Sequence, residues 1–232
     1  MLALLYAVFI LSGAAGLIYE SVWTRYLGLF VGHSAYAQVI VLVIFLGGMS
    51  LGALLVGRYS ERLKQPLYWY AIVELATGVL GLVFHDVFVA TTRCAYASVF
   101  PAVGFGAMQT VVKWGIASLL ILPQSILLGT TFPLMSAGVL RRASEQPGRA
   151  LSMLYFANSL GAAVGVLLAG FWLLGLAGLP GTLTAAAIIN LAVSVIVIVA
   201  LRSGREAAAP AGPFRVSVAL AIAAGAIGLL GP

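Results

Sequence analysis

Two glutamates, Glu20 and Glu74, lie inside long apolar stretches of this sequence. A charged side chain in hydrocarbon costs at least about 2.5 kcal/mol on insertion scales, so it is retained for a function or for a buried partner. On a helix, Gly13 and Gly16 share one face with Glu20, and we expect this small, polar face to point into a bundle. Each glutamate therefore has two open interpretations: it binds a cationic ligand or a proton, or it forms an ion pair that fixes helix register.

The side chains near Glu20 leave both interpretations open. Arg25 is five positions away, roughly 140° round a helix of 3.6 residues per turn, so it is a poor partner within the same helix. Lys113, from another predicted helix, is the alternative partner. Trp23 lies in an aromatic stripe of the same helix. We take Arg25 and Trp23, together with the two glutamates, as candidate residues for binding a ligand or a proton.

Small residues mark the faces where helices are expected to pack closely. Asn158, Gly161 and Gly165 share one face of a predicted helix, and Gly48 and Gly52 repeat the glycine spacing in another. Glycines four positions apart let the backbone of a second helix approach. Asn158 and Asn190 are each expected either to donate an interhelical hydrogen bond or to bind a ligand.

The composition determines the class of protein that positions these residues. Of the 232 residues, 62% are hydrophobic and 8% are charged, whereas soluble domains carry about 25% charged residues. So few charges cannot cover the surface of a soluble globule, and the lipid bilayer is the predicted partner. The net charge of +6 is explained by basic loops that orient a membrane protein, so no nucleic-acid partner is predicted. The single Cys94 excludes an internal disulfide and a cysteine-based metal site.

Apolar stretches of about 20 residues predict an all-α, polytopic bundle of six to seven transmembrane helices. Residues 1–201 are expected to form the six-helix bundle, with residues 85–113 as an extracytoplasmic or interfacial segment. The six main apolar stretches are residues 3–31, 36–56, 67–84, 114–140, 151–174 and 183–201. A seventh apolar stretch, residues 216–232, is short and looks truncated.

The basic residues predict the orientation of the bundle. With alternating helices, nine of the 12 fall in loops on one side, and the other three lie in the first helix or on the opposite side. Cytoplasmic loops carry an excess of Lys and Arg, so the N-terminus is predicted to be cytoplasmic and residues 202–215 to be a basic cytoplasmic linker. The sequence contains no phosphate-binding glycine loop, nucleophile elbow or histidine-based zinc motif, so no catalytic residue, cofactor or metal site is predicted.

Several segments together resemble the membrane region of the bacterial fused major-facilitator/spermidine synthases. The most specific is the run from Tyr19 to Arg25, Tyr-Glu-Ser-Val-Trp-Thr-Arg. Similar segments run from residue 67 to 74, 129 to 135 and 155 to 165. The resemblance implies a bacterial inner-membrane location and a fold like half of a major-facilitator transporter. In that family an aminopropyltransferase-like soluble domain follows the helices, and this chain departs from the pattern by ending before one.

The expected function is that of a membrane region in a spermidine-synthase-like protein, which anchors a transferase domain or handles a small amine-bearing solute. One alternative is a major-facilitator-like transporter module. The other is a non-catalytic accessory subunit that contacts other membrane subunits or a second copy of itself. An enzymatic activity would depend on a soluble domain beyond residue 232.

Overall fold

A computed structural model describes residues 1–32, 34–60, 62–104, 106–143 and 145–203 of the chain. Over these ranges the secondary structure is helical and contains no strand. The predicted seventh helix, residues 216–232, and nearly all of the predicted linker, residues 202–215, lie outside the described residues.

Five helices in the described ranges are long and apolar enough to cross a membrane by length and composition. This finding is compatible with a multi-pass membrane protein and confirms the predicted all-α class. The number differs from the predicted six to seven, because the stretch Pro147–Ser203 contains both the fifth and the sixth predicted helix, with a non-helical break at Gly178 between them. The five are Leu2–Val31, Ala35–Ser60, Pro66–Val103, Ala107–Leu140 and Pro147–Ser203.

Two of these stretches contain short π-helical turns, so the structure divides into more elements than the five helices. In chain order the elements are α1 (Leu2–Val31), α2 (Ser34–Ser60), α3 (Pro66–Cys94), η1 (Ala95–Val99), α4 (Phe100–Val103), α5 (Ala107–Leu140), α6 (Pro147–Leu168), η2 (Ala169–Leu173) and α7 (Leu174–Ser203).

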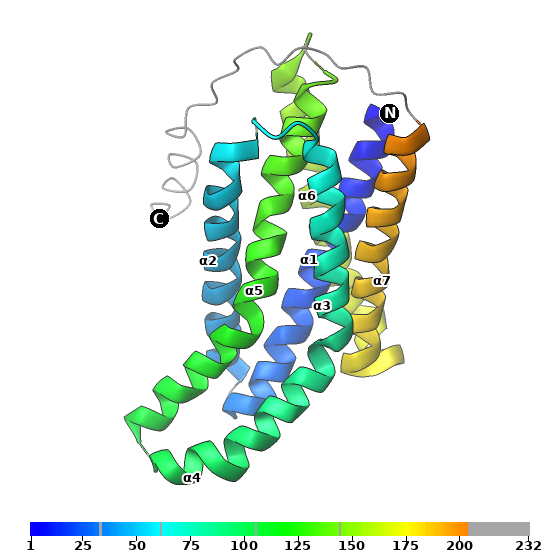
Figure 1. The fold of residues 1–232 in the computed structure, drawn as a ribbon. Coiled ribbons are helices and arrows are strands. Elements are labelled where there is room, and N and C mark those ends of the chain that lie inside the picture. The colour runs from blue at the N-terminus through cyan, green and yellow to red at the C-terminus, as the bar shows by residue number, and fades with distance from the viewer. Residues whose placement is uncertain (33, 61, 105, 144, 204–232) are drawn as a thin grey trace, which may run out of the picture.

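The stretch Pro147–Ser203 reverses direction inside α7. Gly178 has φ 65° and ψ −171°, a non-helical conformation that favours glycine, and Pro180 follows two residues later. The two arms on either side of the break, α6 and the long part of α7, both pack against α1. Figure 1 shows α1 inside the bundle, with α7 rising beside it towards the N-terminus.

The segment predicted to be interfacial, residues 85–113, is largely helical. It comprises the last turns of α3, the elements η1 and α4, and the first turns of α5. The chain turns between α4 and α5, where Gly104 and Gly106 both have positive φ. Figure 1 shows this turn at the end of the bundle opposite the N-terminus. Its position relative to a membrane surface stays a prediction.

The four glycines of the predicted packing motifs all lie where one helix meets the backbone or a Cβ atom of another helix. A Cβ atom on Gly161 would overlap the carbonyl oxygen of Ile10, and one on Gly165 would overlap that of Ala14. Glycines 48 and 52 of α2 meet residues 125 and 126 of α5 in the same way. Their missing side chains therefore allow the α1–α6 and α2–α5 contacts.

Seven of the ten Lys and Arg residues in the described ranges belong to segments at the end of the bundle that holds the N-terminus, which we call the basic end, whereas Arg25, Arg93 and Lys113 lie elsewhere. This end also holds the α2–α3 and α5–α6 connections and the last turn of α7. The guanidinium of Arg141 donates hydrogen bonds to the carbonyl oxygens of Leu63 and Lys64, which ties the two connections together. The described residues in this group are Arg58, Arg62, Lys64, Arg141, Arg142, Arg149 and Arg202.

Candidate functional site

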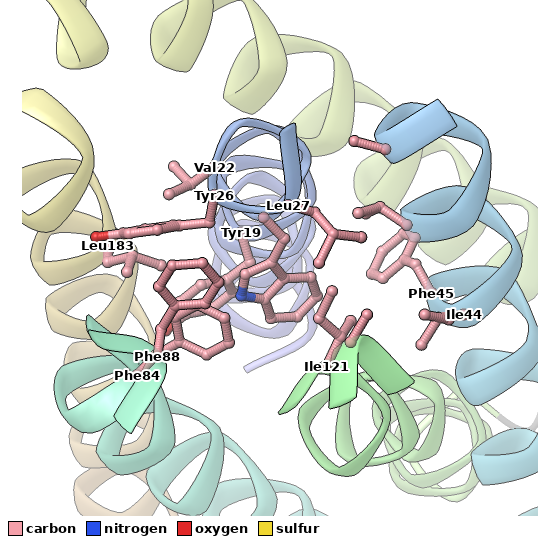
Figure 2. Packing of buried hydrophobic residues seen from close by; sticks show 14 of the residues in the cluster. Tyr19, Val22, Tyr26, Leu27, Ile44, Phe45, Phe84, Phe88, Ile121 and Leu183 are labelled. Atoms are coloured by element: carbon pink, nitrogen blue, oxygen red, sulfur yellow. The ribbon is translucent and has the colours of Figure 1, made fainter. Parts of the chain in front are cut away.

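The interior of the bundle contains two apolar clusters with polar side chains between them. The cluster nearer the basic end includes Phe9 of α1 and Leu67 of α3. The other, which we call the aromatic cluster, includes Trp23 of α1 and Phe84 of α3. Figure 2 shows labelled members of this cluster, among them Tyr19, Tyr26 and Phe84, beside α1. Buried polar residues lie between or beside the two clusters on four helices, and we call them the polar layer: Ser12, Tyr70, Glu74, Thr77, Gln124, Asn190 and Ser194.

Glu74 is the centre of this layer. Its side chain is 0% exposed, and each carboxylate oxygen accepts one hydrogen bond. The Ser12 hydroxyl donates to Oε1 at 2.5 Å, and the Asn190 amide donates to Oε2 at 2.5 Å. Because Ser12 lies on α1 and Asn190 on α7, the carboxylate joins three helices. The interhelical hydrogen bond expected of Asn190 is confirmed.

Several oxygens around Glu74 have no hydrogen-bond partner among the described residues. They are the hydroxyls of Tyr70 and Thr77 and the amide oxygen of Asn190, all on fully buried side chains. Tyr70 lies one helical turn before Glu74, and its hydroxyl is close enough to interact with the carboxylate and with Ser12. Buried polar atoms in folded proteins are normally satisfied, so this cluster of unpartnered oxygens indicates a site.

The polar layer extends from Glu74 towards the aromatic cluster through Gln124 of α5. The Gln124 amide donates to the carbonyl oxygen of Thr77 at 3.1 Å, which links α5 to α3. Its own Oε1 is unpartnered in the described part of the chain. The Tyr19 hydroxyl interacts with the Gln124 side chain without forming a well-directed hydrogen bond. This hydroxyl packs against Gly81, where a Cβ atom would overlap it.

Glu74 has no positively charged partner within the described ranges. Its hydrogen-bonding neighbours, Ser12 and Asn190, are both neutral. An ionised carboxylate in this position is hydrogen-bonded but not neutralised, which is costly inside a membrane. The arrangement can therefore take up a cation or a proton. No group of three or more His, Cys, Asp or Glu side chains forms a metal site in the described ranges.

Glu20 lies in a different environment and is not brought together with Glu74. It is half-buried and forms no ion pair with a described residue. Ser12, which contacts Glu74, is eight residues before it, about 12 Å along the helix axis. Lys113, its predicted partner, instead lies with Nζ 5.5 Å from the centre of the Phe100 ring. The ion-pair interpretation of Glu20 therefore has no support from these residues.

The remaining candidates lie outside the polar layer. The Arg25 side chain is exposed on the outside of α1. Trp23 is fully buried in the aromatic cluster, stacked on Tyr19 with ring centres 5.7 Å apart, and its Nε1 has no partner among the described residues. Asn158 is half-buried at the α1–α6 contact, where a Cβ atom on Gly13 would lie 2.9 Å from its Oδ1.

Five residues of the polar layer carried no site prediction: Ser12, Tyr70, Thr77, Gln124 and Ser194. Part of the signal was present in the sequence, because Tyr70, Glu74 and Thr77 follow the spacing of one helix face. Serine and threonine are too common in membrane helices for their positions alone to identify a site. Their contact with Glu74 or its neighbours depends on how four helices pack.

No protein-family model, curated protein or solved structure matches this chain. The resemblance to the fused major-facilitator/spermidine synthases therefore stays a prediction, and the functional argument depends on the geometry of the bundle.

Proposed function

We propose that this chain is the membrane region of a protein that binds a small, amine-bearing solute, with Glu74 as the counter-charge. The observation that supports the proposal is a fully buried carboxylate held only by neutral donors. A protonated amine supplies a positive charge together with N–H donors. Glu74 would accept the charge, and the unpartnered oxygens of Tyr70 and Asn190 would accept further hydrogen bonds.

For the arrangement in the membrane, we propose six spans with the N-terminus in the cytoplasm of a bacterial cell. This count takes α6 and the long arm of α7 as separate crossings of the inner membrane, in a fold like half of a major-facilitator transporter. The gathering of basic side chains at the N-terminal end supports this orientation, because cytoplasmic ends of membrane helices carry the excess of Lys and Arg.

We further propose, from the resemblance of the Tyr19–Arg25 segment, that the bundle anchors a soluble aminopropyltransferase-type domain. Reading the gene beyond residue 232 tests this part. A glycine-rich nucleotide-binding domain there would support it. Six further membrane helices would favour a transporter module, and a stop codon would favour an accessory subunit.

Binding of n-butylamine, a small amine with a single positive charge, to the purified full chain in detergent, measured by isothermal titration calorimetry, tests the role of Glu74. We expect saturable binding that Glu74→Gln abolishes, because the substitution removes the charge and keeps the shape. Ser136→Ala is the matched control, since Ser136 is a buried polar residue of α5 without a link to Glu74. Equal binding by the parent and Glu74→Gln would refute the proposal, and loss with Glu20→Gln alone would move the site to Glu20.

A further inference from the structure

The side-chain atoms that surround the Glu74 carboxylate without a partner are oxygens. Tyr70 contributes a hydroxyl and Asn190 an amide oxygen, and both side chains are 0% exposed. The Ser12 hydroxyl, 2.5 Å from Oε1, retains its lone pairs for a further contact. With the two carboxylate oxygens, each of which accepts one hydrogen bond, five oxygen atoms from three helices belong to this group of side chains. Oxygen ligands of this kind, namely carboxylate, amide and hydroxyl, are those that hard cations select.

The charge of the site selects the valence of that cation. Glu74 is the only acidic residue in contact with this oxygen set among the described residues, and Ser12, Tyr70 and Asn190 are neutral. A monovalent cation therefore gives a neutral site, whereas a divalent cation leaves a net positive charge in hydrocarbon, where an uncompensated charge is costly. The lack of any group of three or more His, Cys, Asp or Glu side chains in the described ranges also disfavours a divalent site.

We infer that the Glu74 site binds a monovalent metal cation, Na⁺ in the first instance, and that this ion and an amine exclude each other. The exclusion follows from the single carboxylate, because one negative charge cannot neutralise two cations at the same buried position. The part of the inference that concerns the amine rests on the proposed function, whereas the metal-ion site stands without it. Binding of one cation would then require release of the other, as in an exchange.

The metal-ion site is tested by the thermal stability of the purified full chain in detergent. NaCl is titrated at constant ionic strength, with choline chloride as the balancing salt, because the quaternary ammonium of choline has no N–H donor. We expect a saturable rise of Tm with Na⁺ for the parent and for Ser136→Ala, and no rise for Glu74→Gln. Asn190→Ala removes one proposed oxygen ligand and is expected to weaken the Na⁺ affinity about tenfold, the equivalent of a lost hydrogen bond to a charged group. An equal rise of Tm in the parent and in Glu74→Gln would overturn the inference.

The exclusion is tested by repeating the amine calorimetry in NaCl and in choline chloride. We expect the apparent affinity for n-butylamine to fall as Na⁺ rises, in proportion to the Na⁺ concentration above its own dissociation constant. An amine affinity that is the same in both salts would overturn the exclusion and leave the proposed function intact. Stabilisation by Na⁺ through Glu74 without any amine binding would support the metal-ion site and refute the proposed function.

Discussion

Replacing Glu74 by glutamine or by leucine separates the hydrogen bonds of the polar layer from its charge. In Glu74→Gln the remaining oxygen can still accept from Ser12, while the new NH₂ group faces the Asn190 amide. Rotation of that amide by 180° presents its Oδ1, which has no partner among the described residues, as the acceptor. The number of hydrogen bonds is then conserved and a buried charge is removed. We expect the stability of Glu74→Gln to stay within about 1 kcal/mol of the parent or to rise.

Glu74→Leu removes both acceptors and leaves the Ser12 hydroxyl and the Asn190 amide without this partner. Hydrogen bonds between membrane helices contribute about 0.6 kcal/mol on average and about 1.7 kcal/mol at most. Two such bonds give an expected loss of about 1–3 kcal/mol. The volume of the side chain is nearly conserved, so a large cavity does not add to this figure.

The assay is thermal unfolding of both variants in detergent without Na⁺ or amine, with choline chloride as the salt, followed by tryptophan fluorescence and circular dichroism. The order of stability expected is glutamine equal to or above the parent, with leucine below both. If leucine is as stable as the parent, the Glu74 hydrogen bonds do not hold α1, α3 and α7 together as the geometry indicates. If glutamine is clearly less stable than the parent, an unrecognised cation pairs with Glu74 in the folded protein.

Two further predictions concern packing and orientation. Gly161→Leu is expected to destabilise the bundle by about 1–3 kcal/mol or more, because the new side chain would overlap the Ile10 backbone. The control, Leu167→Ile on an exposed part of α6, is expected to have a mild effect. Equal midpoints of SDS unfolding for the two variants would contradict the α1–α6 contact. For the orientation, Arg62→Cys is introduced into a chain in which Cys94 is replaced by serine. In intact cells we expect a membrane-impermeant thiol reagent not to label this cysteine, because it lies on the cytoplasmic side. Labelling from outside would show that the proposed orientation is reversed.

The helices of the bundle were predictable because their signal is local. Long apolar runs identify α1, α2, α3 and α5 within a few residues at most ends. The sequence also divides the stretch Pro147–Ser203 into two predicted helices, residues 151–174 and 183–201, and the break at Gly178 lies in the gap between them. The exact residue of the break was not predictable, because glycine is too frequent in this sequence, with 27 copies, to mark a turn by itself.

The candidate site was predictable only in part, because its chemistry depends on contacts between distant segments. The cost of a carboxylate in hydrocarbon singled out both Glu20 and Glu74, and the glycine-lined face around Glu20 made it the preferred candidate for a function. The structure separates them: Glu74 is fully buried with donors from α1 and α7, and Glu20 is half-buried without such donors. Helix spacing alone placed Glu20 on an inner face, but helix rotation is set by the larger neighbours, and Tyr19 and Trp23 occupy the buried positions instead.

The two apolar clusters determine what binding at Glu74 requires. On the side of the basic end, Phe9 packs against Tyr70 with ring centres 6.2 Å apart and against Phe132 at 5.8 Å. On the opposite side, Trp23 packs against Phe84 at 5.9 Å (Figure 2). Close-packed rings do not admit a hydrated cation, so α1 or α3 must shift, or these rings must rotate, before a ligand enters. The arrangement is therefore an occluded one, and an exchange of cations at Glu74 would need the bundle to open at one end while the rings at the other end stay closed.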